Sequence, residues 1–283
     1  MSDSRPIGIF DSGIGGLTVV HEVFRQLPDE SVVYFGDTAR VPYGTKSAQS
    51  VQRFAMQDAM FLLKYNVKMI VVACHTASAI ALNLLCDQLS LPVFGVTEPG
   101  GKAALKQTRN GKIGVIGTRG TIHSKAYDRY MNALHPDIFL MTQPCPLFVP
   151  LAEEGWMDTD VTERIAQIYL SSMKRAGIDT LILGCTHYPL LKGVIQQVMG
   201  SDVILIDSAE ETVRSVKQVL QKKQMNNPGQ RKPIHRFFVS DIPDQFQEIG
   251  ERFLGCTLSP VEQVDMEVIE MLKISKISSM KIE

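Results

Sequence analysis

The sequence of 283 residues has no apolar run near the ~20 residues that a membrane-spanning helix needs. Its charges almost cancel, with 29 Lys and Arg against 30 Asp and Glu, so it offers no strong field to nucleic acid or to an anionic membrane. Its first residues carry no apolar signal core. We therefore expect a cytoplasmic protein that binds neither nucleic acid nor membrane.

Cysteine is sparse, and no Cys-x-x-Cys pair occurs among Cys74, Cys86, Cys145, Cys185 and Cys256. An odd number of widely spaced cysteines argues against a disulfide framework, a zinc ribbon and a thioredoxin-like redox site. Cys86 lies in an apolar helical pattern, and no polar motif surrounds Cys145 or Cys256, so we expect all three to be structural. Cys74 and Cys185 are therefore the two cysteines that we consider as functional residues.

The length favours two domains, and predicted strands alternate with predicted helices along most of the chain. Strands are expected near residues 5–11, 31–36, 68–73, 92–96, 112–117, 137–142, 180–184, 202–206 and 236–239. Helices are expected near 14–27, 47–64, 76–89, 99–108, 120–134, 159–176, 189–199, 209–222 and 244–253. This alternation predicts an α/β fold with mostly parallel sheets covered by helices.

Cys74 and Cys185 occupy equivalent positions in what looks like a duplicated unit. Each follows a continuous apolar run, typical of a strand buried on both faces. The step from Asp11, at the end of the first strand, is 63 residues (11 to 74), and the step from Gly117 is 68 (117 to 185). The next strand ends 24 residues (74 to 98) and 23 residues (185 to 208) later. The alternative is that any two α/β halves begin with similar strands.

We therefore predict two pseudo-symmetric α/β domains with the active site between them. The first would comprise residues 1–98, completed by the returning segment 208–283, and the second residues 99–207. Ligands bind at the carboxyl ends of parallel strands. Both thiols should therefore project into one crevice.

A glycine-rich loop follows the first strand and opens a helix. Gly13-x-Gly15 resembles a dinucleotide fingerprint, but Thr18 stands where that motif needs Gly or Ala. The loop could instead bind a carboxylate or a phosphate through the free N–H groups at the start of the helix. Asp11, at the strand end, fits a proton-handling or ammonium-binding role, with helix capping as the alternative.

Three further segments carry candidate residues. Pro42-Tyr43-Gly44 fixes a bend that can present backbone N–H groups and a phenol, or is a plain connecting turn. Glu153 lies near Trp156 in a segment that is either a crevice wall or a solvated loop. Thr118 and Thr121 lie on the turn equivalent to the glycine-rich loop, and their hydroxyls are suited to bind a substrate carboxylate.

Each cysteine has an imidazole and a hydroxyl beside it, in Cys74-His75-Thr76 and Cys185-Thr186-His187. A metal site has the right ligand types, yet adjacent residues chelate one tetrahedral ion poorly. Acyl transfer by a Cys-His nucleophile would use one of the two cysteines and would give the equivalent cysteine no role. A two-base reaction uses both thiols, one removing a proton from carbon and the other delivering one to the opposite face. Asp11 and His187 are the candidates to assist Cys74 and Cys185.

With these residues assembled, the chain closely resembles the bacterial glutamate racemases. The matching motifs are residues 8–17, 35–37 with 42–44, 76–78, 117–121 and 184–191, in one order between residues 7 and 254. The resemblance implies a cofactor-independent enzyme that interconverts L- and D-glutamate and supplies D-glutamate for peptidoglycan. It requires no metal and fits a homodimer, which is common in such enzymes.

The resemblance also implies roles for individual residues. Cys74 and Cys185 would be the acid/base pair. Asp37 and Glu153 would support the site, and Thr118 and Thr121 would line it. Substrate contacts would come from Asp11, Ser12, Tyr43, Gly44, His75, Thr76, Thr186 and His187.

One departure from the family pattern concerns His75, where the family usually has Asn. Imidazole offers a donor and an acceptor, as Asn does, but it is larger and can become charged near pH 6.5. We expect retained activity with altered affinity and a shifted pH profile. Two alternatives stay open, an aspartate racemase-like enzyme and a non-catalytic amino-acid-binding protein.

Overall fold

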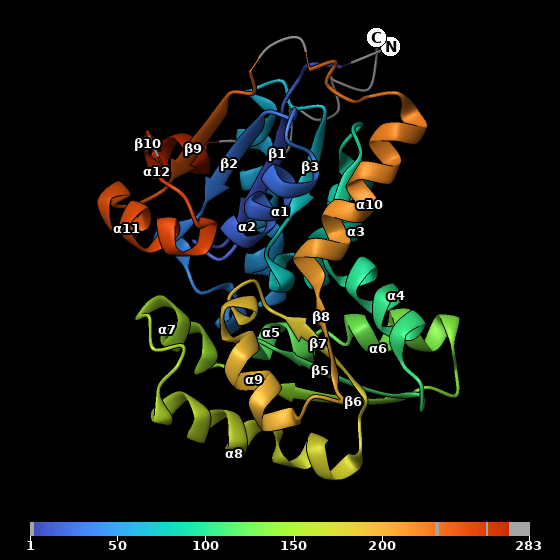
Figure 1. The fold of residues 1–283 in the computed structure, drawn as a ribbon. Coiled ribbons are helices and arrows are strands. Elements are labelled where there is room, and N and C mark those ends of the chain that lie inside the picture. Colours follow the sequence, from blue (N-terminus) through green and yellow to red (C-terminus); the bar gives the residue numbers. More distant parts are fainter. Residues whose placement is uncertain (1–2, 230–231, 259, 272–283) are drawn as a thin grey trace.

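The computed structural model describes residues 3–229, 232–258 and 260–271, and in them the chain forms two parallel sheets flanked by helices (Figure 1). The first sheet has the order β10-β9-β2-β1-β3-β4. Its strands are β1 (Ile7–Asp11), β2 (Val32–Gly36), β3 (Met69–Val72), β4 (Val93–Gly95), β9 (His235–Val239) and β10 (Val261–Gln263). The second sheet has the order β6-β5-β7-β8. Its strands are β5 (Lys112–Gly117), β6 (Phe139–Pro144), β7 (Thr180–Gly184) and β8 (Ile204–Asp207).

The two sheets repeat one topology, because β2-β1-β3-β4 in the first corresponds to β6-β5-β7-β8 in the second. Phe10 of β1 lies opposite Val72 of β3, so Asp11 and Cys74 emerge at the same sheet edge. In the second sheet Gly117 lies opposite Gly184, which places Thr118 beside Cys185. The predicted fold, with two pseudo-symmetric parallel α/β units, is confirmed.

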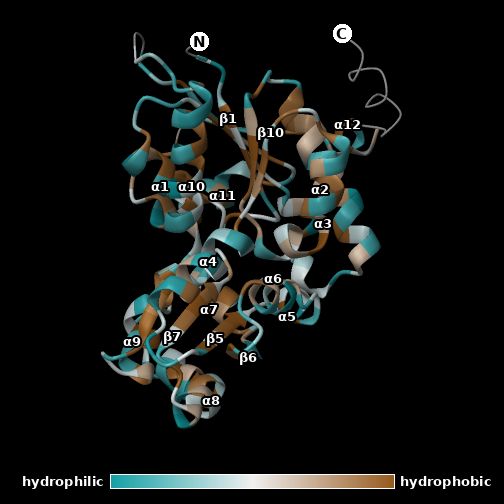
Figure 2. Cartoon of the chain, turned by 90° about the vertical axis from the view of Figure 1, so that its right-hand side faces the viewer, coloured by the Kyte–Doolittle hydropathy of each residue, from teal (hydrophilic) through white to brown (hydrophobic). Residues whose placement is uncertain are grey.

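Burial explains why the central strands read as continuous apolar runs. Every residue of β1, β2, β3 and β7 is buried, since helices cover both faces of each sheet. Figure 2 shows these strands as hydrophobic ribbons between helices with hydrophilic outer faces. The covering helices in the first half are α1 (Leu17–Gln26), α2 (Ala48–Leu63), α3 (His75–Gln88), α10 (Ser208–Lys223), α11 (Pro243–Leu254) and α12 (Met266–Glu270). Those of the second half are α4 (Thr97–Gln107), α5 (Arg119–His123), α6 (Ala126–Leu134), α7 (Phe148–Glu153), α8 (Asp160–Ala176) and α9 (Lys192–Met199). In the described ranges no helix is long and apolar enough to cross a membrane.

Three expectations from the sequence were wrong. The helix expected over 120–134 is two helices, α5 and α6, because Lys125 between them is left-handed, with φ 56°. The segment near Glu153, for which a crevice wall and a solvated loop were both open, contains helix α7, so the loop alternative is wrong. Cys86, expected in the core, is exposed, as is Cys256. Consecutive helical residues point about 100° apart, so Leu85 is buried while its neighbour Cys86 faces solvent.

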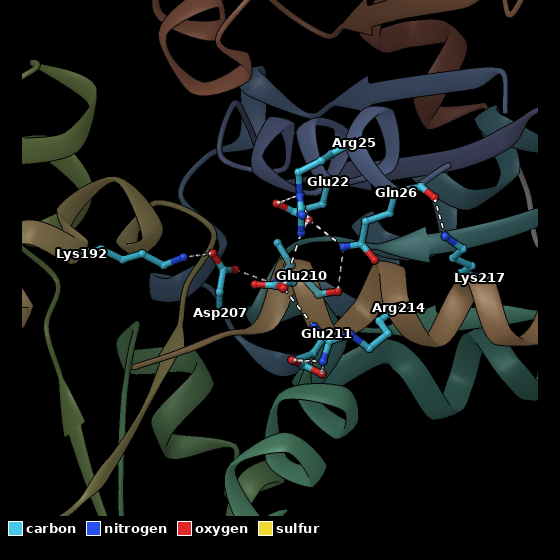
Figure 3. A network of polar contacts seen from close by, with 10 residues as sticks. Glu22, Arg25, Gln26, Lys192, Asp207, Glu210, Glu211, Arg214 and Lys217 are labelled. Atoms are coloured by element: carbon cyan, nitrogen blue, oxygen red, sulfur yellow. Dashed lines mark hydrogen bonds and ion pairs between the residues drawn. The ribbon is translucent and has the colours of Figure 1, made fainter. Parts of the chain in front are cut away.

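The C-terminal part of the chain returns to the first sheet, where β9 pairs with β2. Helix α10 starts directly after β8 and packs against α1. Figure 3 shows the polar contacts along this seam, where Gln26 bonds to the Glu210 carbonyl at 3.2 Å and Arg25 pairs with the Glu210 carboxylate at 3.5 Å. These contacts support the division into 1–98 with 208–283 and 99–207, which stays a prediction.

Candidate active site

Asp11 ends β1 as a buried carboxylate with one unused oxygen. Its Oδ2 accepts a hydrogen bond from the Gly13 N–H at 3.0 Å, while Oδ1 is buried without a partner. Burial raises the pKa of Asp11, against the opposing effects of His187 and the backbone N–H groups of Gly13 and Gly16. Helix α1 has Gly16 at its N-cap, so the helix-capping alternative for Asp11 is wrong.

Cys74 lies directly between β3 and α3, with 6% of its surface exposed. Its thiol reaches the Ser12 hydroxyl at 3.5 Å. Burial, together with the nearby charge of Asp11, raises the pKa of the Cys74 thiol to about 12. In the unliganded site Cys74 is therefore a protonated thiol at neutral pH.

His75 is the first residue of α3, and neither of its ring nitrogens has a hydrogen-bond partner although the residue is only 4% exposed. Burial lowers the pKa of His75 to about 3. The expected change of charge near pH 6.5 is therefore wrong. His75 offers the crevice a neutral ring with one donor and one acceptor.

Cys185 follows β7 and lies beside an imidazole that is bonded at its far side. His187 Nδ1 is 3.8 Å from the Cys185 sulfur, and His187 Nε2 is 2.9 Å from Oε1 of Glu153. Burial alone would lower the pKa of His187, but the hydrogen bonds and negative charges of Cys185 and Glu153 outweigh it and raise the pKa to about 10. His187 is therefore an imidazolium at neutral pH.

Helices α7 and α11 hold this pair. Glu153 ends α7, and Arg252 of α11 donates to its carbonyl oxygen at 3.1 Å. Phe253 presents its ring edge-on to His187, with centroids 5.3 Å apart. Arg252 and Phe253 were not predicted from the sequence, because they reach Glu153 and His187 respectively only through the return of the chain.

Three threonines from the two halves form a cluster of hydroxyls. Thr76 Oγ1, on α3, lies 2.8 Å from Thr118 Oγ1 and 3.4 Å from Thr121 Oγ1. Thr118 and Thr121 are themselves 3.0 Å apart. Three hydroxyls at this spacing can turn donors and acceptors toward one anionic oxygen.

The glycine-rich loop lies tightly against the second half of the chain. A Cβ on Gly15 would lie 2.2 Å from Thr186 Oγ1 and 2.6 Å from the His187 ring. A Cβ on Gly44 would lie 2.8 Å from the Thr118 Cβ. The loop that reaches Cys74 through Ser12 thus also abuts the loop that carries Cys185.

The phenol of Tyr43 contacts two buried acids of the first half. Its hydroxyl contacts Oδ2 of Asp37 and lies 2.8 Å from Oδ2 of Asp58, both buried carboxyl groups. The phenol is therefore held by two buried acids, and the substrate contact expected from Tyr43 stays a prediction. Gly44 of the same loop lies against Thr118 of the second half. Asp37 lies beneath the loop, where the Ser240 hydroxyl donates to its Oδ1 at 3.0 Å.

Sequence reasoning missed two members of this network. Asp58 lies on α2 among buried apolar residues, and Arg40 bridges it to Asp37. A single acid on the apolar face of a predicted helix was the available signal. In the ranges that the structure describes, no group of three or more His, Cys, Asp or Glu side chains is arranged to hold a metal ion.

Comparison with known proteins identifies relatives over almost the whole chain. Residues 7–216 match the family model described as Asp/Glu/Hydantoin racemase. The glutamate racemase of Geobacter metallireducens is 52% identical over 263 residues, which cover 93% of this chain and 97% of the relative.

Solved structures agree. Glutamate racemase isoform RacE1 from Bacillus anthracis has a TM-score of 0.89 at 44% identity, covering 93% of this chain and 98% of that one. Glutamate racemase from Francisella tularensis, solved in complex with D-glutamate, has a TM-score of 0.88 at 41% identity, covering 94% and 99%. The chain is therefore a racemase that belongs to the Asp/Glu/Hydantoin racemase family, and within it to the glutamate racemases.

Proposed function

We propose that the protein interconverts L- and D-glutamate without a cofactor, by proton transfer between Cys74, Cys185 and the substrate α-carbon. The observation that carries the proposal is the equivalence of the two thiols. Each follows the third strand of a repeated sheet, and both cysteine loops abut the loop after β1. Inversion at carbon needs an acid and a base on opposite faces, which a duplicated thiol supplies.

Glutamate would be held by the unpartnered polar atoms of Asp11 and His75 and by the cluster of threonine hydroxyls. The unused Oδ1 of Asp11 is a buried acceptor suited to the substrate ammonium. The hydroxyls of Thr76, Thr118 and Thr121 suit a carboxylate, and the neutral ring of His75 can donate to it. The remaining contacts are assigned to Ser12, Pro42, Gly44 and Thr186.

Binding of the ammonium would also activate Cys74. Asp11 is one cause of the raised Cys74 pKa, since its negative charge disfavours a thiolate beside it. A substrate ammonium on Asp11 compensates that charge. The substrate therefore lowers the barrier to forming the thiolate that attacks its own α-hydrogen.

On the other face the His187 imidazolium supports Cys185. His187 Nδ1 lies 3.8 Å from the Cys185 sulfur, and Glu153 keeps the imidazole protonated from the other side of the ring. In one direction a thiolate takes the α-hydrogen as a proton, and the electron pair left on carbon spreads into the α-carboxylate. The opposite thiol then donates its proton to carbon, so each sulfur ends in the other's initial state.

A wider role is part of the same proposal. D-Glutamate made in this way would supply peptidoglycan synthesis, and the enzyme would act in the cytoplasm, as a homodimer. The Francisella tularensis relative was solved with D-glutamate, which supports glutamate as the substrate here.

Exchange of the substrate α-hydrogen in heavy water tests the proposal. The protein should incorporate deuterium into L- and D-glutamate and bring each enantiomer to a racemic mixture without added metal or cofactor. Faster exchange of aspartate would favour the aspartate racemase-like alternative. Binding of glutamate with no exchange would leave only an amino-acid-binding protein.

A further inference from the structure

A buried cluster beneath the loop of Tyr43 holds two carboxyl groups but one cation. The side chains of Asp37 and Asp58 are fully buried, and Arg40 is 10% exposed. Arg40 Nε donates to Asp37 at 2.6 Å, and Nη2 donates to Asp58 at 3.0 Å. Two ionised carboxylates would leave one uncompensated negative charge in this interior, which is strongly unfavourable.

The hydrogens in the cluster can be counted. The Tyr43 hydroxyl carries one hydrogen, yet its oxygen lies within hydrogen-bonding distance of both Asp37 and Asp58. An ionised carboxylate only accepts. With both acids ionised, one of these two contacts would lack a hydrogen between its oxygens.

The surroundings determine which acid carries the missing hydrogen. Asp37 accepts from Arg40 and, at its other oxygen, from the Ser240 hydroxyl, whose own oxygen is already used by the Ala39 N–H. Among the residues that the structure describes, Asp58 accepts from Arg40 only, through Oδ1, and it turns Oδ2 to Tyr43. Asp37 therefore receives more hydrogen bonds than Asp58, and it is the acid that is better stabilised as a carboxylate.

We infer that Asp58 is a protonated positioning residue, whose carboxyl O–H donates to the Tyr43 oxygen while the Tyr43 hydroxyl donates to ionised Asp37. The charged or titratable groups acting on Asp58 are Asp37, Arg40, Tyr43 and, farther away, Asp11. Burial, with the charge of Asp37, raises the pKa of Asp58 well above its usual range, in accord with this assignment.

These hydrogen bonds, from Asp58 through Tyr43 to Asp37, fix the loop that carries Gly44. Tyr43 is followed by Gly44, which lies against Thr118 of the other half of the chain. Releasing the Tyr43 ring would let Gly44 move, and small displacements near reacting groups cost about 100-fold in rate. This step rests on the proposed function, since it assumes that the crevice binds the substrate.

The protonation state predicts an asymmetric pair of variants. Asp58→Asn keeps an acceptor toward Arg40 and a donor toward Tyr43, so kcat/KM should change by less than about threefold. Asp58→Ala removes both and should lower kcat/KM by about 10-fold or more. Asp37→Asn replaces a carboxylate that accepts from Arg40, Tyr43 and Ser240 by an amide, which turns either its own donor or a neutral oxygen toward them. It should lower kcat/KM as much as Asp58→Ala does. Circular dichroism would confirm that each variant is folded.

A direct measurement uses protein labelled with ¹³C at the aspartate carboxyl carbons. One resonance should keep the shift of a protonated acid at pH 7 and vanish in Asp58→Asn, while Asp11→Asn identifies any second one. An ionised Asp58 at pH 7, or a loss in Asp58→Asn equal to that in Asp58→Ala, would overturn the inference. A wild-type protein inactive on glutamate would refute the proposed function, yet the carboxyl shift would still decide the proton on Asp58.

Discussion

Thr76 and Thr118 place their hydroxyl oxygens 2.8 Å apart although Thr76 lies on α3 of the first half and Thr118 caps α5 of the second. Thr76 follows the first cysteine, and Thr118 follows the central strand β5 of the second sheet. A direct bond between the halves at this point means that the two strand ends face each other.

The two thiols should be equally indispensable. Cys74→Ser and Cys185→Ser should each lower racemisation by about 100-fold or more, because a serine hydroxyl is a far weaker acid and base at the α-carbon. The rate is followed by the change in optical rotation from either enantiomer. Cys86→Ser, on the exposed face of the same helix as His75, is the matched control and should be unaffected. Wild-type turnover in either active-site variant would refute the two-base mechanism.

Glu153 should set the charge of His187. The pKa of His187 is raised to about 10, so its ring should stay protonated through pH 8 in ¹⁵N NMR titrations. Glu153→Gln removes a negative charge 2.9 Å from Nε2 and should move that pKa downward, so the cation is lost at lower pH. Glu154→Gln alters the exposed neighbour and should leave the titration unchanged. An unmoved His187 titration in Glu153→Gln would disprove the coupling.

His75 should not titrate in the working range. With its pKa near 3, the ring is neutral both below and above pH 6.5. His75→Asn should therefore change KM without altering its dependence on pH between about 5.5 and 8, since both side chains are neutral donors and acceptors there. A pH-dependent KM that His75→Asn abolishes would show that the ring does become charged.

Gly15 should be intolerant of any side chain. A methyl group there would overlap Thr186 and His187, so Gly15→Ala should separate the two halves and lower kcat/KM by about 100-fold. Gly193→Ala, where the nearest atom to a new Cβ is 3.9 Å away, is the control and should be harmless. Steady-state kinetics with unchanged thermal unfolding would assign the loss to geometry. Full activity in Gly15→Ala would show that the loops need not touch.

The sequence was informative wherever local pattern and chemistry coincide. Continuous apolar runs ending in Cys74 and Cys185 predicted both the parallel sheets and the strand-end thiols. The repeat spacing predicted the duplicated topology, which follows from two strands with equivalent neighbours.

Where contacts arise from distant segments, the sequence could not predict them. Ser240 bonds to Asp37 across 203 positions, and no local pattern connects them. The neutral state of His75 arises from burial by the assembled protein rather than from its neighbours in sequence. Helix α7 was missed because Pro150 and the acidic residues near it are typical of a turn.

The return of the chain to the first sheet also determines the order in which the two sheets can be completed during synthesis on the ribosome. The four strands of the second sheet are complete once residue 207 has emerged, whereas β2 lacks its outer neighbour β9 until residues 235–239 follow. Nascent chains therefore expose one bare β2 edge during the last part of synthesis, and unpaired edges invite association with other chains. Truncation just before residue 235 should yield aggregates, even though both cysteines would already be present.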